Sequence, residues 1–124
     1  MATEEILRLN QRLLETVAAG DWAAYSQLCD PSLSAFEPEA VGNLVEGMDF
    51  HKYYFDLPKS NVPKNTTMVR PHVRIMGDVA VVSYIRLVQY VDANGAPQTG
   101  KSEETRIWQR QQDSWKHVHF HRSV

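Results

Sequence analysis

Apolar residues in the first part of the chain recur every three or four positions: Ile6, Leu9, Leu13, Leu14 and Val17. This spacing predicts an amphipathic helix of about 16 residues, with Thr3 as its N-cap. Gly20 is suited to a left-handed cap at the end of this helix, and Asp21 can begin a second, short helix. Asp30 and Pro31 would stop the second helix. The pattern therefore predicts a helical hairpin at the start of the fold.

Turn-forming residues dominate the next segment. Pro38, Gly42 and Gly47 interrupt residues 32–47, which we expect to be short extended pieces joined by turns. Residues 48–57 return to helical spacing and predict a third helix. Its apolar face would carry Phe50, Tyr53, Tyr54 and Leu57.

From Thr66 the repeat of apolar positions changes to the two-residue period of a strand. We expect four strands, at 67–76, 79–91, 97–111 and 115–122. Short turn sequences separate them, so the strands follow one another as antiparallel hairpins. The fold class is therefore α+β, with N-terminal helices packed on an antiparallel sheet.

Composition limits the possible classes of protein. The chain has 124 residues, of which 43% are hydrophobic and 23% charged, which is typical of a single globular domain spanning residues 1–124. The mean hydropathy of −0.42 and the lack of an apolar run of about 18 residues argue against a membrane protein. The acidic N-terminus carries no leader pattern. We expect the single cysteine, Cys29, to be a small buried side chain. Because one cysteine cannot form a disulfide within the chain, the sequence is consistent with a cytoplasmic protein.

Charge is distributed unevenly along the chain. The net charge of −2 argues against a nucleic-acid partner. Residues 1–63 hold ten acidic and four basic residues (−6), whereas residues 64–124 hold five acidic and nine basic residues (+4). We expect the basic half to contain an inward-facing anion site. Glu37, Glu39 and Glu46, which lie around turns, are candidate subunit contacts.

Three arginines fall on strand faces that also carry aromatic and aliphatic residues: Arg86, Arg106 and Arg122. In the last strand the shared face would hold Lys116, Val118, Phe120 and Arg122. One interpretation is a set of solvated arginines with apolar stems along the sheet. The other is a pocket in which they converge and require counter-charges, from Glu104 and from an anionic ligand such as a carboxylate.

The histidines of the last strand alternate, which predicts that His117, His119 and His121 point away from the face of Arg122. Three histidines in line cannot converge on one ion, so we expect surface or subunit-interface packing and no metal site. His51 could reach the pocket as a hydrogen-bond donor or could simply pack in the core.

Few residues suggest catalysis. Glu104 with Tyr84 or Tyr25 is the candidate acid–base set. Because Arg106 lies two residues away on the same face, Glu104 is expected to be an ion-paired carboxylate with a lowered pKa rather than a base. No glycine-rich nucleotide-binding, kinase or nucleophile-elbow motif is present.

Several strings resemble a known family. They include Phe-Glu-Pro-Glu-Ala at 36–40, Ser-Glu-Glu-Thr-Arg at 102–106 and His-Phe-His-Arg-Ser at 119–123. Together with 42–47, 49–51 and 84–86, they resemble the association (hub) domain of calcium/calmodulin-dependent protein kinase II, from about residue 4 to the C-terminus.

The resemblance implies a cone-shaped fold of the nuclear-transport-factor-2-like type and a non-enzymatic role without cofactor. It also implies homo-oligomerisation into a closed ring of stacked dimers, commonly of twelve or fourteen subunits. The family's pocket for small carboxylates, or for a segment of the kinase linker, corresponds here to Arg86, Arg106, Arg122, His51 and Tyr25.

The chain departs from the family in its loop 56–65, which is shorter than in animal members and has Lys59 near the place of their tryptophan. No kinase or calmodulin-binding segment is present, so we expect an excised domain or a free-standing hub protein. Two alternatives remain open within the same fold: a small-molecule isomerase, dehydratase or hydrolase, and a dimeric transport adaptor.

Overall fold

The computed structural model describes residues 1–59 and 63–124, and it begins with two helices. Helix α1 (Ala2–Ala19) ends at Gly20, whose left-handed backbone (φ 68°) confirms the predicted cap. Thr3 was wrongly predicted as the N-cap, because the helix already begins after Met1, whose carbonyl accepts a hydrogen bond from Glu5 N.

Helix α2 (Trp22–Leu28) begins as predicted at Asp21, whose carboxylate accepts a hydrogen bond from Ala24 N. The chain then passes directly into strand β1 (Cys29–Phe36). Asp30 and Pro31 therefore lie inside a strand and do not terminate the helix. This eight-residue strand was expected only as short extended pieces.

The segment after β1 forms a 3-10 helix, η1 (Pro38–Ala40), the short strand β2 (Val45–Glu46) and helix α3 (Asp49–Phe55). The existence of α3 is confirmed, but its predicted apolar face is not the face that packs within the chain. His51 and Phe55 point inward, whereas Tyr53 and Tyr54 are exposed. The two tyrosines of this helix therefore remain exposed within one chain, whereas Phe50 and Phe55 are half-buried.

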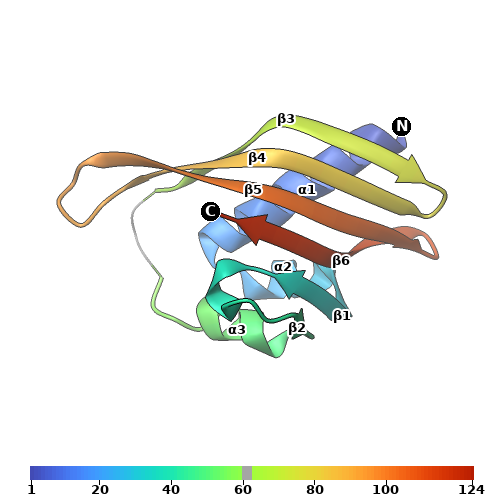
Figure 1. Cartoon of the computed structure of the whole chain (residues 1–124), viewed down its shortest axis with the longest axis horizontal. Helices are drawn as coiled ribbons and strands as arrows, with labels where there is room; N and C mark the ends of the chain where they lie inside the picture. The colour runs from blue at the N-terminus through green and yellow to red at the C-terminus, as the bar shows by residue number, and fades with distance from the viewer. Residues whose placement is uncertain (60–62) are drawn as a thin grey trace.

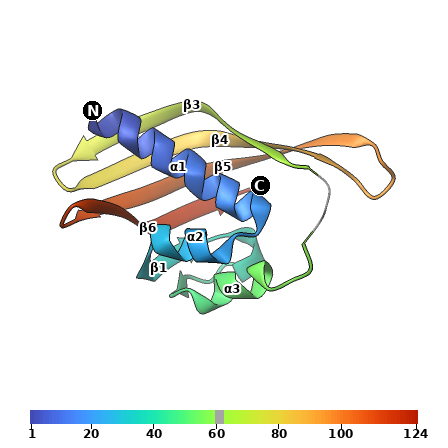
Figure 2. The ribbon, with the colours of Figure 1, turned by 180° about the vertical axis from the view of Figure 1, so that it is seen from behind.

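The predicted strands are all present, as β3 (Asn65–Met76), β4 (Val79–Val91), β5 (Pro97–Gln111) and β6 (Ser114–Ser123). One sheet contains all six strands in the order β2-β1-β6-β5-β4-β3. Its pairs are antiparallel except β1 with β6, which run parallel. Helices α1 and α2 cover one face of the curved sheet, and the β4–β5 hairpin extends beyond it (Figures 1 and 2).

A β-bulge in β6 changes which side chains point inward. Ile107 pairs with His119, but the next residue, Trp108, pairs with His117, so Val118 is an extra residue in β6. Trp115 and His117 therefore share the inner face with Phe120 and Arg122. The prediction that Lys116 and Val118 lie on that face, and His117 on the other, was wrong for this reason.

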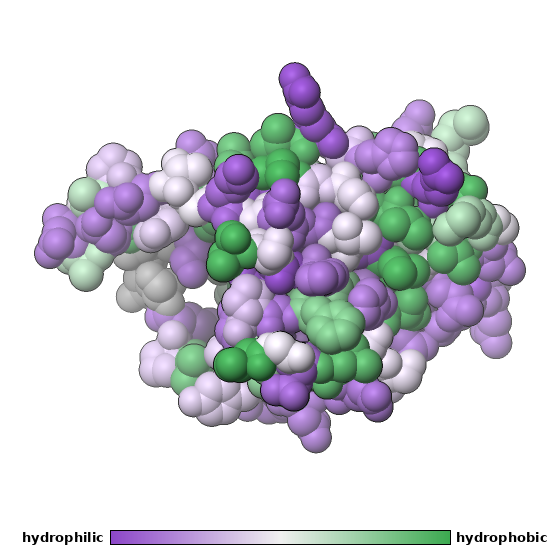
Figure 3. Space-filling model, in the orientation of Figure 1, coloured by the Kyte–Doolittle hydropathy of each residue, from purple (hydrophilic) through white to green (hydrophobic). Residues whose placement is uncertain are grey.

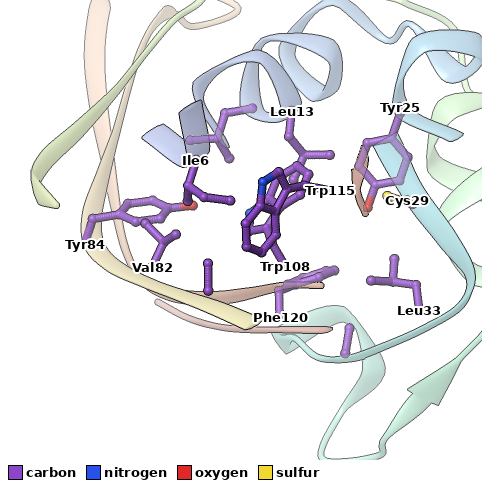
Figure 4. Packing of buried hydrophobic residues seen from close by; sticks show 13 residues of the cluster. Ile6, Leu13, Tyr25, Cys29, Leu33, Val82, Tyr84, Trp108, Trp115 and Phe120 are labelled. Carbon is purple, nitrogen blue, oxygen red and sulfur yellow. The ribbon is translucent and has the colours of Figure 1, made fainter. Parts of the chain in front are cut away.

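The core lies between α1 and the inner face of the sheet. Figure 4 shows Ile6 and Leu13 of α1 pointing toward Trp108 and Trp115 of the sheet. Each fully buried side chain of this kind contributes about 1.5–3 kcal/mol. The buried amide of Asn10 accepts a hydrogen bond from Trp108 Nε1 (2.9 Å), which fixes the helix against β5.

The outer face of the sheet, seen in Figure 3, is mainly hydrophilic with separate apolar patches. Across the part of the chain that the structure describes, no helix is long and apolar enough to cross a membrane.

Candidate functional site: an arginine-lined pocket

A cavity of about 250 Å³ lies between the helices and the inner face of β4, β5 and β6. All five residues predicted for the site line it: Tyr25, His51, Arg86, Arg106 and Arg122. The rest of the wall consists of Val17, Glu37, Glu39, Tyr54, Phe55 and Phe120. The structure thus brings together side chains from α2, α3 and three neighbouring strands.

Glu104 does not line the pocket itself but is the carboxylate that pairs with two of its lining arginines, Arg86 and Arg106. Its Oε1 accepts hydrogen bonds from Tyr84 Oη (2.5 Å) and Arg106 Nε (3.1 Å), and Arg86 Nη1 lies 3.3 Å from its Oε2. The antiparallel register places Tyr84 directly opposite Glu104 on the neighbouring strand. The expected pairing of Glu104 with the arginines is confirmed.

Arg106 is held on several sides. Its Nε also lies 3.0 Å from Tyr84 Oη, its Nη1 lies 3.4 Å from His117 Nε2, and its guanidinium carbon stands 4.3 Å above the ring centre of Phe120. Such a buried guanidinium is stabilised only while its partners remain. Arg86 is the less buried of the two and also donates from Nε to Thr66 Oγ1 (3.2 Å).

These contacts shift the pKa values of Glu104 and Tyr84. Burial alone would raise the pKa of Glu104, but Arg106 and Arg86 outweigh it and lower that pKa to about 2. Burial raises the pKa of Tyr84 to about 12, against the opposing effect of Arg106. Glu104 is therefore ionised at neutral pH and a weak base, as expected.

The ion-pair partners of Arg122 lie outside the sheet. Its Nη2 donates a hydrogen bond to Glu39 Oε1 and lies 3.8 Å from Glu37 Oε2. The side chain of Glu37 is only 9% exposed and lines the pocket, so little of it is accessible for the subunit contact that the sequence predicted. Sequence reasoning did not place Glu37 and Glu39 in the site, although three arginines facing one glutamate indicated missing negative charge.

His51 and Tyr25 form the side of the pocket that faces the helices. His51 is buried, and burial together with Arg106 lowers its pKa to about 4, so its ring is neutral at physiological pH. Its Nδ1 lies 3.4 Å from Glu37 Oε1. Burial raises the pKa of Tyr25 far above its ordinary value, so its hydroxyl stays protonated.

The three histidines of β6 have separate surroundings. His117 is fully buried between Arg106 and Cys29, with its Nδ1 3.5 Å from the Cys29 sulfur. His119 Nδ1 lies 2.7 Å from Ser34 Oγ, and His121 is exposed. Within residues 1–59 and 63–124, no group of three or more His, Cys, Asp or Glu side chains is arranged to hold a metal ion.

The architecture defines a broad class of protein. A nuclear transport factor 2-like superfamily protein from Salmonella enterica superposes with a TM-score of 0.76 at 21% identity, covering 97% of this chain and 88% of that one. At this identity the similarity establishes the fold alone. The chain has the α+β, cone-shaped fold of that superfamily.

The sequence places the chain more narrowly. Residues 2–124 match the calcium/calmodulin dependent protein kinase II association domain, and the chain belongs to this family. It is 54% identical over 123 residues to the delta subunit of the type II kinase of Oryctolagus cuniculus, covering 97% of this chain and 23% of that protein. The chain thus spans about a quarter of the length of this relative.

Solved structures agree with this assignment. The hub homology domain from Chlamydomonas reinhardtii has a TM-score of 0.95 at 53% identity, covering 100% of this chain and 98% of that one. The association domain of the C. elegans kinase has a TM-score of 0.94 at 44% identity, covering 99% and 95%. The family is one of association domains and not of catalytic ones, which confirms the expectation of a non-enzymatic domain.

Proposed function

We propose that residues 1–124 form one hub domain that assembles with copies of itself into a closed ring of stacked dimers, with twelve or more subunits. The match to an association-domain family along almost the whole chain carries this proposal. Closed symmetric assembly is also the usual form of a large homo-oligomer.

The surface of one chain supports assembly. On α3, Tyr53 is 63% and Tyr54 42% exposed, and Leu57, two residues beyond the end of the helix, is 44% exposed. Met76 and Val41 add further exposed apolar side chains elsewhere on the chain. Grouped apolar side chains of this kind commonly mark contacts between proteins, because their burial removes apolar area from water. A second copy of the chain is the occupant we propose for the α3 face.

We also propose a kinase as the partner of the assembled hub. Because the chain spans 23% of the rabbit kinase subunit, attachment to a kinase, on the same chain or on another, is part of the proposal. A cytoplasmic location is also proposed, and the reduced, buried Cys29 is consistent with it.

The pocket is proposed as a site for a small carboxylate, bound by Arg86, Arg106, Arg122, His51 and Tyr25. Arginine suits this ligand because its planar fork matches the two oxygens of a carboxylate. A hollow of about 450 Å³ adjoins the pocket, shares Val17, Tyr54 and Phe55 with it, and includes Lys59 and Lys64. A longer acidic segment, such as a kinase linker, could extend from the pocket into this hollow.

The assembly is tested by native mass, where only a species far above a dimer supports the ring. The pocket is tested by calorimetric titration of butyrate into the assembled protein. Arg122→Gln should weaken binding about tenfold or more, because it removes a charge-assisted hydrogen bond. Arg74→Gln, the same change at an exposed position of β3, should bind like the parent. Equal affinities in both variants would contradict the pocket.

The alternative of an isomerase, dehydratase or hydrolase of the same fold is not favoured. A general base must be able to accept a proton near neutral pH. Glu104 has no exposed side-chain surface, and its pKa is lowered to about 2. Its two oxygens already accept hydrogen bonds from Tyr84, Arg106 and Arg86.

A further inference from the structure

The pocket contains its own counter-anions on the side of η1. Arg122 is the most exposed of the three pocket arginines, with 19% of its side chain accessible. Its guanidinium is hydrogen-bonded to Glu39 and lies close to Glu37. A ligand carboxylate arriving at Arg122 therefore meets a cation that is already paired.

Two buried polar atoms in the pocket have no partner among the described residues: Glu37 Oε1 and His51 Nε2. Both side chains are more than nine-tenths buried, and both line the cavity. The 3.4 Å approach of His51 Nδ1 to Glu37 does not satisfy the geometry of a hydrogen bond with Oε1. Leaving such atoms unpaired is costly, so the cavity is built for a group that hydrogen-bonds there.

The charges around the cavity already balance. Arg86, Arg106 and Arg122 supply three positive charges. Glu37, Glu39 and Glu104 supply three negative charges when all are ionised. Adding a ligand anion to this set would leave an excess negative charge in a largely buried space. Two carboxylates in such a space avoid mutual repulsion when one of them is protonated.

We propose that Glu37 and Glu39 are internal competitors for the arginine pocket, so that a bound anion replaces Glu39 at Arg122 while Glu37 takes up a proton from solvent. The inference rests on the proposed carboxylate site and names the residues that set its affinity. In the bound state the anion accepts hydrogen bonds from Arg122 and from a His51 tautomer protonated at Nε2. The neutral carboxyl of Glu37 can then donate its hydrogen bond to the ligand.

Burial and a neighbouring carboxylate favour Glu37 as the site of proton uptake, although several other ionisable groups also face it. They are Glu39 on η1, Tyr25 on α2, His51 and Tyr54 on α3, Arg86 on β4, Glu104 and Arg106 on β5, and Arg122 on β6. Burial and then Glu39 raise the pKa of Glu37, while Arg122 and Arg106 oppose that rise. His51 stays neutral above pH 5, because its own pKa is lowered to about 4.

The direction of the pH effect follows from this exchange. Protonated Glu37 accompanies the bound anion, so affinity should rise as the pH falls. Uptake of one proton on binding changes the affinity about tenfold per pH unit over the range in which the free carboxyl is ionised and the bound one is protonated.

The test is calorimetric titration of the assembled parent protein with propane-1-sulfonate, whose charge is constant from pH 5.5 to 7.5, and with butyrate at pH 6.5 and 7.5. The parent should bind more tightly at lower pH. Glu37→Gln should bind about tenfold or more tightly than the parent at pH 7.5 and lose the pH dependence. Glu103→Gln, which removes the same charge from the opposite face of β5, should behave like the parent.

Each outcome decides a separate point. The inference is contradicted if the affinity of the parent does not change with pH and Glu37→Gln binds no more tightly than the parent. That result would not contradict the proposed carboxylate site. Absence of binding in every variant at every pH overturns the pocket and this inference together. If Glu37→Gln does not fold, Glu39→Gln, a partly exposed position, must bind more tightly than the parent for the inference to survive.

Discussion

Arg106 and Glu104 lie two residues apart on the inner face of β5, and their buried side chains are joined at 3.1 Å. Strand alternation places both on one side, and the packed helices exclude water from them. Neither charge is stable there alone, because the desolvation of a buried ion is offset only by its partner. The pair therefore fixes the position of Arg106, which lines the pocket.

Glu104→Gln is expected to lower the free energy of unfolding by about 3 kcal/mol, because Arg106 and Arg86 lose their shared buried counter-charge. Chemical denaturation at a fixed protein concentration measures the change. Glu103→Gln, on the exposed face of the same strand, should stay within about 0.5 kcal/mol of the parent. Equal losses in the two variants would contradict the structural role of the pair.

The same pair predicts a dependence on acid. Glu104 has a pKa lowered from 4.5 to about 2 in the folded chain. The ionised carboxylate therefore stabilises the fold fully above about pH 4.5 and loses this contribution as the pH falls toward 2. The difference in stability between the parent and Glu104→Gln should narrow from pH 5 to pH 3. A gap that stays constant over this range would exclude Glu104 as its source.

Cys29 should be unreactive in the folded protein. It is buried next to His117, and burial raises the pKa of its thiol to about 12, so almost no thiolate forms near pH 8. A colorimetric thiol reagent should label one group per chain in denaturant and essentially none under native conditions over the same time. Rapid native labelling would show that the site opens to solvent.

The face of α3 predicts a variant that affects assembly. Tyr53→Glu adds a charge to an aromatic side chain that is 63% exposed in one chain, so it should lower the mass of the assembly while leaving the helical content unchanged. Gln112→Glu, the same added charge in the exposed β5–β6 turn, is the control. An unchanged mass for Tyr53→Glu would show that α3 does not lie between subunits.

Periodicity predicted the elements of this fold well. The spacing of Ile6, Leu13 and Leu14 indicated α1, and the two-residue alternation after Thr66 indicated the four long strands to within a few residues. These signals are clearest in α1, β4 and β5, because each of these elements buries one regularly spaced set of side chains. The arginines of β4 and β5 were placed correctly, since their strands pair without a bulge.

The missed features depend on tertiary structure. The bulge at Val118 reverses the alternation within β6, and nothing in the local pattern marks it. The helical spacing in α3 identified an apolar face but could not tell whether it packs within the chain or against another chain. Glu37 points inward because its extended backbone (φ −151°, ψ 156°) continues the alternation of β1, in which Leu33 and Ala35 are buried. The sequence indicated only short extended pieces in this segment, so the alternation could not be followed to Glu37.

The central claim is most directly tested by mass photometry of the purified chain from nanomolar to micromolar concentration. One chain has a mass of 14.2 kDa, so a ring of twelve would have a mass of about 170 kDa. We predict one or a few closely spaced species at or above that mass that persist on dilution, as expected for a closed ring. A protein that remains at 14.2 kDa, or at the roughly doubled mass of a dimer, throughout this range would contradict the account.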